Sequence, residues 1–240
     1  MDKLTFNSLE LIKEFCNKNK NYEYKVENNR IMIKNRIGAS CIFTFSKQIK
    51  IRPSTIGLIH GEGYVKDTFI FANSDELIIK NILRFLSQFY DMKLKTYLEI
   101  CTKNTNKEFI EKSKNTWNRL IKVDKIRLRN EFNNTTDNGT LHIIYTNKIF
   151  CQILNFILNK SKDIIKNNRE LAIDYLKGII AAEGNINIKK QTRCVYMIRI
   201  SAKEEKEREF YKELLKKIGI KVTCKDMKTI SKEEGKKLGW

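Results

Sequence analysis

The spacing of apolar residues changes along the chain between the period of a helix and that of a strand. Leu9, Ile12 and Phe15 fall on one helical face, whereas Lys125–Arg129 alternates basic and apolar residues as a strand does. Helices are expected over residues 7–19, 53–63, 73–90, 107–121, 147–158, 170–184 and 203–218. Strands are expected over residues 22–35, 40–51, 93–102, 122–132, 140–146 and 220–226, with hairpins over 64–72 and 185–201. This alternation predicts a mixed α+β fold.

One order of elements occurs twice along the chain. A helix that ends in a glycine, a hairpin and a second helix follow Pro53, and the same order returns after residue 170, roughly 120 residues later. The repeat predicts two similar domains or two pseudo-twofold halves of one domain. The expected organisation is a small N-terminal α/β extension over residues 1–50, a first half over 51–160, a polar linker over 161–169 and a second, shortened half over 170–240.

The two copies share a seven-residue pattern. Gly57–Gly63 and Gly178–Gly184 both read glycine, Leu or Ile, Ile, any residue, a small residue, glutamate and glycine. Small residues four positions apart lie on one helical face and let two backbones approach more closely than the usual ~8–10 Å. The final Gly63 and Gly184 suit the left-handed position that ends many helices. The pattern predicts a helix pair whose contact is made by the small residues Gly57, Gly61, Gly178 and Ala182.

Glu62 and Glu183 take the last helical position of each copy, which is unfavourable for a carboxylate. The helix dipole is negative there, and two like charges that converge repel each other. A hard divalent cation removes both penalties, and Mg²⁺ binds a few carboxylates together with water and phosphate oxygens. One Glu-Gly at a helix end is more often structural, but its duplication favours a site at which Glu62 and Glu183 bind Mg²⁺ or Mn²⁺ for phosphodiester chemistry.

These motifs resemble those of the LAGLIDADG homing endonucleases, particularly the archaeal single-chain members with two motifs. The nine-residue motif corresponds to Thr55–Gly63 and Leu176–Gly184, and its acidic residue to Glu62 and Glu183. The resemblance covers roughly residues 50–226 through the order helix–hairpin–helix. It implies two αββα halves joined through the motif helices, sheets that straddle the major groove of double-stranded DNA, and catalytic acids that bind metal and cut both strands across the minor groove.

Three features depart from the family pattern. His60 and Ala181 stand at the first acidic position of the motif, and His60 is expected to be packed rather than catalytic. Family nucleases often carry Gln or Lys near the end of the second hairpin strand, where this chain has 72–73 and 201–202, Ala-Asn and Ser-Ala. Nine residues separate Gly63 from Asn73, against 16 between Gly184 and Ser201, so the first hairpin is short.

Composition then restricts the remaining classes of protein. The chain has 47 Lys+Arg against 28 Asp+Glu, a net charge of +19, and its 41% apolar residues exclude a disordered chain. We expect no transmembrane helix and no signal peptide, and the absence of a C-x-x-C pair favours reduced thiols and a cytoplasmic location. The charge indicates a polyanionic partner, although the Lys bias of an A/T-rich genome would give the same surplus.

Basic and amide side chains on the predicted strands form the candidate nucleic-acid surface. In the major groove, Arg and Lys read guanine and Asn and Gln read adenine. The candidate residues are Lys125, Arg127 and Arg129 in the first half, and Asn185, Asn187, Lys189, Gln191 and Arg193 in the second. In the second half, the opposite phase of Cys194, Tyr196, Ile198 and Ile200 is expected to be buried. An ordinary amphipathic strand with a solvated face is the alternative for each strand taken singly.

The sequence leaves three functions open. The first is a monomeric, site-specific homing endonuclease that makes metal-dependent double-strand cuts in DNA. The second is a catalytically inactive DNA- or RNA-binding protein on the same scaffold, such as a transcriptional regulator or an intron maturase. The third is a basic structural protein of a ribonucleoprotein particle. The intact acidic pair favours the first function, and the short first hairpin and the missing lysines favour the second.

Overall fold

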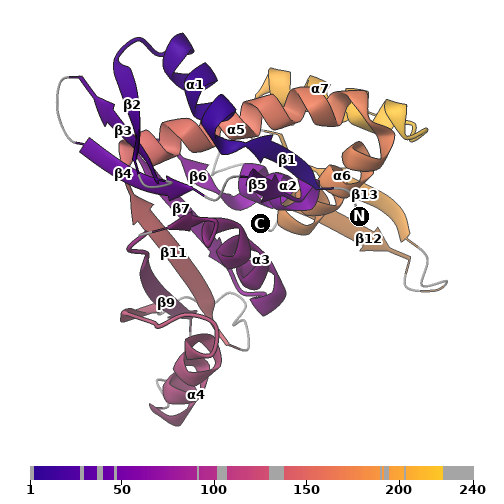
Figure 1. The fold of residues 1–240 in the computed structure, drawn as a ribbon. Coiled ribbons are helices and arrows are strands. Elements are labelled where there is room, and N and C mark those ends of the chain that lie inside the picture. The colour runs from indigo at the N-terminus through magenta and orange to yellow at the C-terminus, as the bar shows by residue number, and fades with distance from the viewer. Residues whose placement is uncertain are drawn as a thin grey trace, which may run out of the picture.

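Both copies of the repeated order helix–hairpin–helix are present in the computed structural model. The structure describes residues 3–27, 30–36, 40–45, 48–90, 92–101, 107–129, 138–189, 191, 195–202 and 204–223. The mixed α+β class is confirmed (Figure 1). The first half contains α2 (Pro53–Glu62), β6 (Tyr64–Val65), β7 (Thr68–Asn73) and α3 (Glu76–Leu86). The second half repeats this order as α6 (Arg169–Glu183), β12 (Gly184–Ile188), β13 (Val195–Ile200) and α7 (Glu205–Lys217).

The first half continues into a five-stranded sheet. After α3 come β9 (Lys95–Cys101), α4 (Lys107–Asn118), β10 (Lys125–Arg129), β11 (Thr140–Thr146) and α5 (Lys148–Asn167). The strand order is β10-β9-β11-β7-β6. β10 and β11, expected on either side of a turn, do not pair with each other. β10 instead pairs in parallel with β9, because α4 crosses from one to the other, and β11 pairs antiparallel with β9 and β7.

This sheet has one buried and one partly exposed face. Alternate residues of β7, β9 and β11 are buried: Phe69, Phe71, Leu98, Ile100, Leu141 and Ile143. The α5 ring of Phe150 packs edge-on against Phe69 on this side. The other face presents the half-exposed Tyr97 and His142, whose rings stack in parallel with centroids 4.1 Å apart. The period of two along each strand therefore leaves an open face on the first half.

Local capping groups set the helix ends. Pro53 opens α2, as its fixed φ predicts, and Asn147 caps α5 by accepting from the Phe150 N–H. The helix expected from residue 73 begins at Glu76 instead. Its cap is Asp75, whose carboxylate accepts from the Leu77 and Ile78 N–H groups, so the expected start at residue 73 is wrong.

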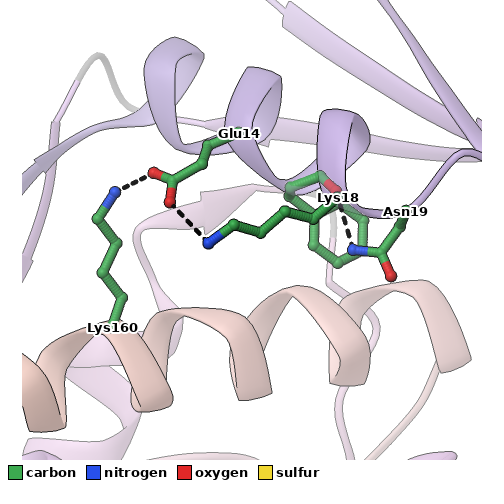
Figure 2. A network of polar contacts seen from close by, with 5 residues as sticks. Glu14, Lys18, Asn19 and Lys160 are labelled. Carbon is green, nitrogen blue, oxygen red and sulfur yellow. Dashed lines mark hydrogen bonds and ion pairs between the residues drawn. The ribbon is translucent and has the colours of Figure 1, made fainter.

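The N-terminal extension consists of β1 (Leu4–Asn7), α1 (Ser8–Lys18), β2 (Tyr22–Glu27), β3 (Arg30–Asn35), β4 (Ser40–Phe45) and β5 (Gln48–Ile51). The single strand expected over 22–35 is instead a hairpin of β2 and β3. Its sheet continues from β3 to β4 and from β4 to β8 (Phe89–Tyr90), and β1 pairs separately with β5. Figure 2 shows Glu14 of α1 bridging Lys18 and Lys160, so the extension is joined to α5. Its buried residues share one core with both halves.

The linker expected over 161–169 is wrong. α5 runs to Asn167, and Asn168 alone separates it from α6. Helix continues because Ser161 and Ile165 prolong the buried face of α5. Asn168 both donates its N–H to the Ile165 carbonyl and caps α6 by accepting from the Leu171 N–H.

The second half has a two-stranded sheet, β12-β13, in the part of the chain that the structure describes. Gly219 ends α7 with φ of +86°, a left-handed position that suits glycine. The strand expected over 220–226 is absent from residues 220–223, and residues 224–226 lie outside the described chain. Among the described helices, none is both long and apolar enough to cross a membrane.

Candidate metal site and nucleic-acid surface

Helices α2 and α6 touch backbone to backbone. A Cβ atom added to Gly57 would lie 2.4 Å from the Tyr175 carbonyl oxygen, and one added to Gly178 would lie 2.0 Å from that of Ser54. Real Cβ atoms do not approach within 3.0 Å of such atoms. Side chains at these two positions would therefore force the helices apart, so the structure places Gly57 and Gly178 at the contact that the sequence predicts.

The contact is pseudo-twofold. Beyond the two carbonyls, the added Cβ on Gly57 would meet the Ile179 nitrogen, and that on Gly178 would meet the Leu58 nitrogen. One offset, of 121 residues, relates Gly57 to Gly178 and Leu58 to Ile179. The repeated pattern thus builds two equivalent halves of one interface.

The C-terminal ends of α2 and α6 also meet, at residues related by the same offset. A Cβ added to Gly61 would lie 2.5 Å from the Ala182 Cβ and 3.1 Å from the Glu183 Cγ, so the Glu183 side chain lies against α2. Glu62 follows Gly61 directly, and the Glu183 charge acts on it. The two candidate metal ligands are therefore neighbours at one end of the helix pair.

The terminal glycines differ from expectation. Gly63 and Gly184 have φ of −80° and −79°, which is extended and not left-handed. Glycine is required there for a steric reason, because a Cβ would lie 2.4 Å from the Ile59 carbonyl oxygen and 2.3 Å from that of Ile180. The chain can then leave each helix directly into a strand.

Asn73, at the end of β7, holds the Glu62 carboxylate. The Asn73 Nδ2 donates to Glu62 Oε2. The Asn73 Oδ1 accepts from the Asp75 N–H at 2.7 Å, which leaves only the NH₂ group to face Glu62. Burial raises the pKa of Glu62, the Asn73 hydrogen bond lowers it, and the Glu183 charge raises it further. The ionised pair is thus unfavourable without a counterion.

The donor set fits a hard divalent cation. Within the described residues, no group of three or more His, Cys, Asp and Glu side chains gathers at one place. Two carboxylates without nitrogen or sulfur donors do not make a zinc site. They fit Mg²⁺ or Mn²⁺, which complete their shells with water and phosphate oxygens.

Sequence reasoning missed Asp174. This buried residue of α6 accepts from the Ser54 N–H at 3.1 Å and so caps α2 from the other half. The N-cap residue of α2, Arg52, has no side-chain cap of its own. Two features of the sequence could have indicated this contact. The first motif helix starts at Arg-Pro without a capping residue, and the second carries an acidic residue on its buried face.

The basic strand β10 lies at the outer edge of the five-stranded sheet. In its register on β9, Lys125 lies beside Tyr97 and Arg127 beside Glu99, on the open face. Lys125 and Arg127 are exposed, whereas the Arg129 Nε pairs with Glu99 Oε2 at 3.0 Å. The opposite face of the edge strand is not fully covered, because Leu128 is 44% exposed.

In the second half, the structure covers part of the predicted surface. Asn185 lies in β12 opposite Arg199, Asn187 is half-buried, and Lys189 and Gln191 are exposed. Arg193 and Cys194 lie outside the described residues, as does the side chain of Tyr196. Ile200 is half-buried.

The expected burial of the apolar phase is wrong for Ile198, which is 48% exposed and lies beside Ile186, itself 49% exposed. In the first half, the matching strand β7 lies between two strands, β11 and β6, and contacts α2, α3 and α5. In the described part of the second half, β12 and β13 pair with each other alone and contact α6, so their outer isoleucines stay exposed.

Comparison with known proteins identifies one part of the chain. Residues 170–240, which begin with α6 and its motif, match the family described as LAGLIDADG-like domain. The second half of this protein is therefore similar to LAGLIDADG-like domains. The resemblance drawn from the two motifs is thereby confirmed for the second copy. No curated protein sequence matches the chain.

A solved structure has a distant likeness to the chain. It is that of a variant of I-DmoI in complex with its target DNA and in the presence of 2 mM manganese. The two share 14% identity over 70% of this chain and 75% of that chain, with a TM-score of 0.37.

Proposed function

We propose that this protein is a site-specific DNA endonuclease that makes metal-dependent cuts in both strands of a duplex. The observation that carries the proposal is the meeting of Glu62 and Glu183 at the end of two helices packed backbone to backbone. Both carboxylates are placed where the helix dipole and mutual repulsion oppose them, and only a bound cation relieves both. Their presence in a protein with a LAGLIDADG-like domain supports phosphodiester cleavage.

Each residue of the site has a distinct role in this proposal. Glu62 and Glu183 would hold Mg²⁺ or Mn²⁺, and Asn73 orients the Glu62 carboxylate through its hydrogen bond. The bound metal supplies activation of water and stabilisation of the leaving 3′ oxygen. Gly57 and Gly178 act indirectly, since their missing side chains let the two acids come close.

The open face of the five-stranded sheet is the proposed DNA-binding surface of the first half. Lys125 and Arg127 on its edge are exposed and suit phosphate oxygens or guanine. In the second half the same role falls to the ribbon residues Asn185, Asn187, Lys189, Gln191 and Arg193. The net charge of +19 gives such a surface its affinity for a polyanion. The protein acts as a monomer, because its internal repeat already supplies both halves.

A non-cleaving scaffold that binds DNA or RNA is the second candidate. The observation that favours it is the first hairpin, in which β6 has only two residues. At ~3.3 Å per residue such a strand reaches few base pairs. In addition, the residue that contacts Glu62 is Asn73, which carries no charge to place beside a scissile phosphate.

A randomised duplex library separates the two candidates. The protein is incubated with the library in Mg²⁺, and the bound and cut fractions are both sequenced. An endonuclease yields a cut fraction with one recurring sequence, and Glu62→Gln retains that sequence in the bound fraction alone. A bound fraction without any cut fraction, in both Mg²⁺ and Mn²⁺, would contradict cleavage and support the non-cleaving scaffold.

A further inference from the structure

A chain of buried and half-buried polar side chains crosses the interface beside the candidate site. The His60 Nδ1 of α2 lies 3.0 Å from the Tyr175 Oη of α6. The Tyr175 ring lies beside that of Tyr211 of α7, with centroids 6.4 Å apart, and the Tyr211 Oη donates to Glu207 Oε1 at 2.8 Å. We call His60, Tyr175, Tyr211 and Glu207 the polar chain. It connects α2 of the first half to two helices of the second.

Two hydrogen bonds hold the polar chain. A carboxylate only accepts, so Tyr211 donates to Glu207. The His60 Nδ1 and the Tyr175 hydroxyl share the other hydrogen bond, which crosses from α2 to α6. Burial lowers the pKa of His60 to about 3, with a smaller effect of the Lys162 charge, so the imidazole is neutral at pH 7. Removing any member leaves a buried neighbour without its partner.

A fourth helix balances the charge at the end of the polar chain. Lys162 of α5 places its Nζ over the Phe210 ring, 5.6 Å from the centroid. Burial lowers the pKa of Lys162, while the charges of Glu207 and Glu204 raise it. Lys162 therefore brings a positive charge to the neighbourhood of Glu207, where α5, α6 and α7 lie together in Figure 1.

The polar chain breaks the symmetry of the interface. The offset that relates the two motifs turns His60 into Ala181 and Tyr175 into Ser54, and these residues cannot form the same contact. The glycine contact is equivalent on both sides and consists of small residues without side chains that interlock. Directional hydrogen bonds of fixed length specify one register of such a surface, as single buried polar residues do between other helix pairs.

We propose that the polar chain is a positioning network that fixes the register of α2 on α6 and thereby sets the separation of the Glu62 and Glu183 carboxylates. Its relevance to cleavage rests on the proposed function. His60 lies two residues before Glu62 on the same helix, so a shift of α2 along α6 moves Glu62 directly. Tyr175 is the central member, because its hydroxyl contacts His60 of α2 and its ring lies beside that of Tyr211 of α7.

A double-mutant cycle on unfolding tests this without metal or DNA. Glu62→Gln removes a charge that burial and the Glu183 charge both oppose, so its effect on the unfolding equilibrium constant reports where α2 places Glu62 within the protein and relative to Glu183. Tyr175→Phe keeps the ring and deletes the central hydroxyl. We expect the effect of Glu62→Gln to change by at least about twofold in the Tyr175→Phe background. Equal effects in both backgrounds would overturn the proposal, because a merely structural hydroxyl changes stability additively.

The matched control is Tyr22→Phe, which deletes a hydroxyl that donates to the Gln152 side chain, between β2 and α5. In the Tyr22→Phe background, the effect of Glu62→Gln on the unfolding equilibrium constant should equal its effect in the unchanged protein. Should Tyr175→Phe fail to fold, His60→Phe removes the other partner of the same hydrogen bond and gives the same cycle with the same criterion. If the protein cuts no duplex, the proposed nuclease function is wrong. The proposal about the register of α2 on α6 is still decided by the result of this cycle.

Discussion

Gly57 and Gly178 are essential to the contact between α2 and α6 because they have no side chains. A single methyl group at either position would overlap the main chain of the facing helix, which cannot move aside as a flexible side chain can. Glu62 shows the opposite case, in which a group is present where stability alone disfavours it. Burial and the neighbouring Glu183 charge raise its pKa, and one hydrogen bond from Asn73 opposes them.

Gly57→Ala should therefore lower the free energy of unfolding by about 1–3 kcal/mol, because the helices must separate to accept the Cβ. The measurement is urea unfolding at equilibrium. Ala181→Leu is the matched control, since Ala181 is exposed on the same helix pair and should change stability by no more than about 0.5 kcal/mol. Equal effects of the two substitutions would contradict backbone contact at Gly57.

Glu62→Gln should stabilise the metal-free protein at neutral pH, because the amide still accepts from Asn73 but carries no charge. The raised pKa of Glu62 means that the folded protein binds this proton more tightly than the unfolded chain. Its ionisation therefore costs stability as pH rises above the ordinary glutamate value of 4.5. We expect the gain from the substitution to be present at pH 7 and to vanish below pH 4.5, in thermal unfolding followed across that range. A gain independent of pH would show that charge is not its cause.

At the scale of elements, the two motif helices depend on each other for more than their contact. α2 starts with Arg52 and Pro53, neither of which caps it, and Asp174 of α6 supplies the missing acceptor. The negative charge also suits the positive end of the α2 dipole. One helix of the pair thus completes the other, in addition to bringing its acid to the common end.

Asp174→Ala should lower the free energy of unfolding by about 0.5–2 kcal/mol, the usual cost of losing a helix cap. Asp174→Asn keeps an acceptor for the Ser54 N–H and should recover much of that loss. Chemical unfolding of both variants, with the exposed Asp163→Ala of α5 as control, measures the difference. Equal losses in the Ala and Asn variants would show that the side chain does not act as a cap.

At the scale of the whole molecule, the features that could be predicted are those that depend on residues close together in the sequence. Pro53 and Asn147 predicted the starts of α2 and α5, and the repeated glycines predicted the helix contact. The linker over 161–169 was wrong because the burial of Ser161 and Ile165 depends on packing against other elements. The Asp174 cap, between residues 120 apart in the sequence, likewise arises only when the halves meet.

The distribution of charge should appear in the salt dependence of DNA binding. If about six to ten Lys and Arg contact phosphates, affinity for duplex DNA should fall about 10³–10⁵-fold between 50 and 200 mM salt. Replacing Lys125, Arg127 and Arg129 by alanine should weaken binding and reduce that slope, as fluorescence anisotropy would measure. A flat salt response would mean that the +19 charge forms no nucleic-acid surface.

Strand-resolved cleavage of a duplex recovered from the library tests the acidic pair most directly. The unchanged protein should cut both strands in Mg²⁺ or Mn²⁺. Glu62→Gln and Glu183→Gln should each abolish the cut in at least one strand and leave the affinity for the duplex nearly unchanged, because only the charge that holds the metal is removed. Cleavage of both strands at the original rate by either variant would contradict a metal site between Glu62 and Glu183.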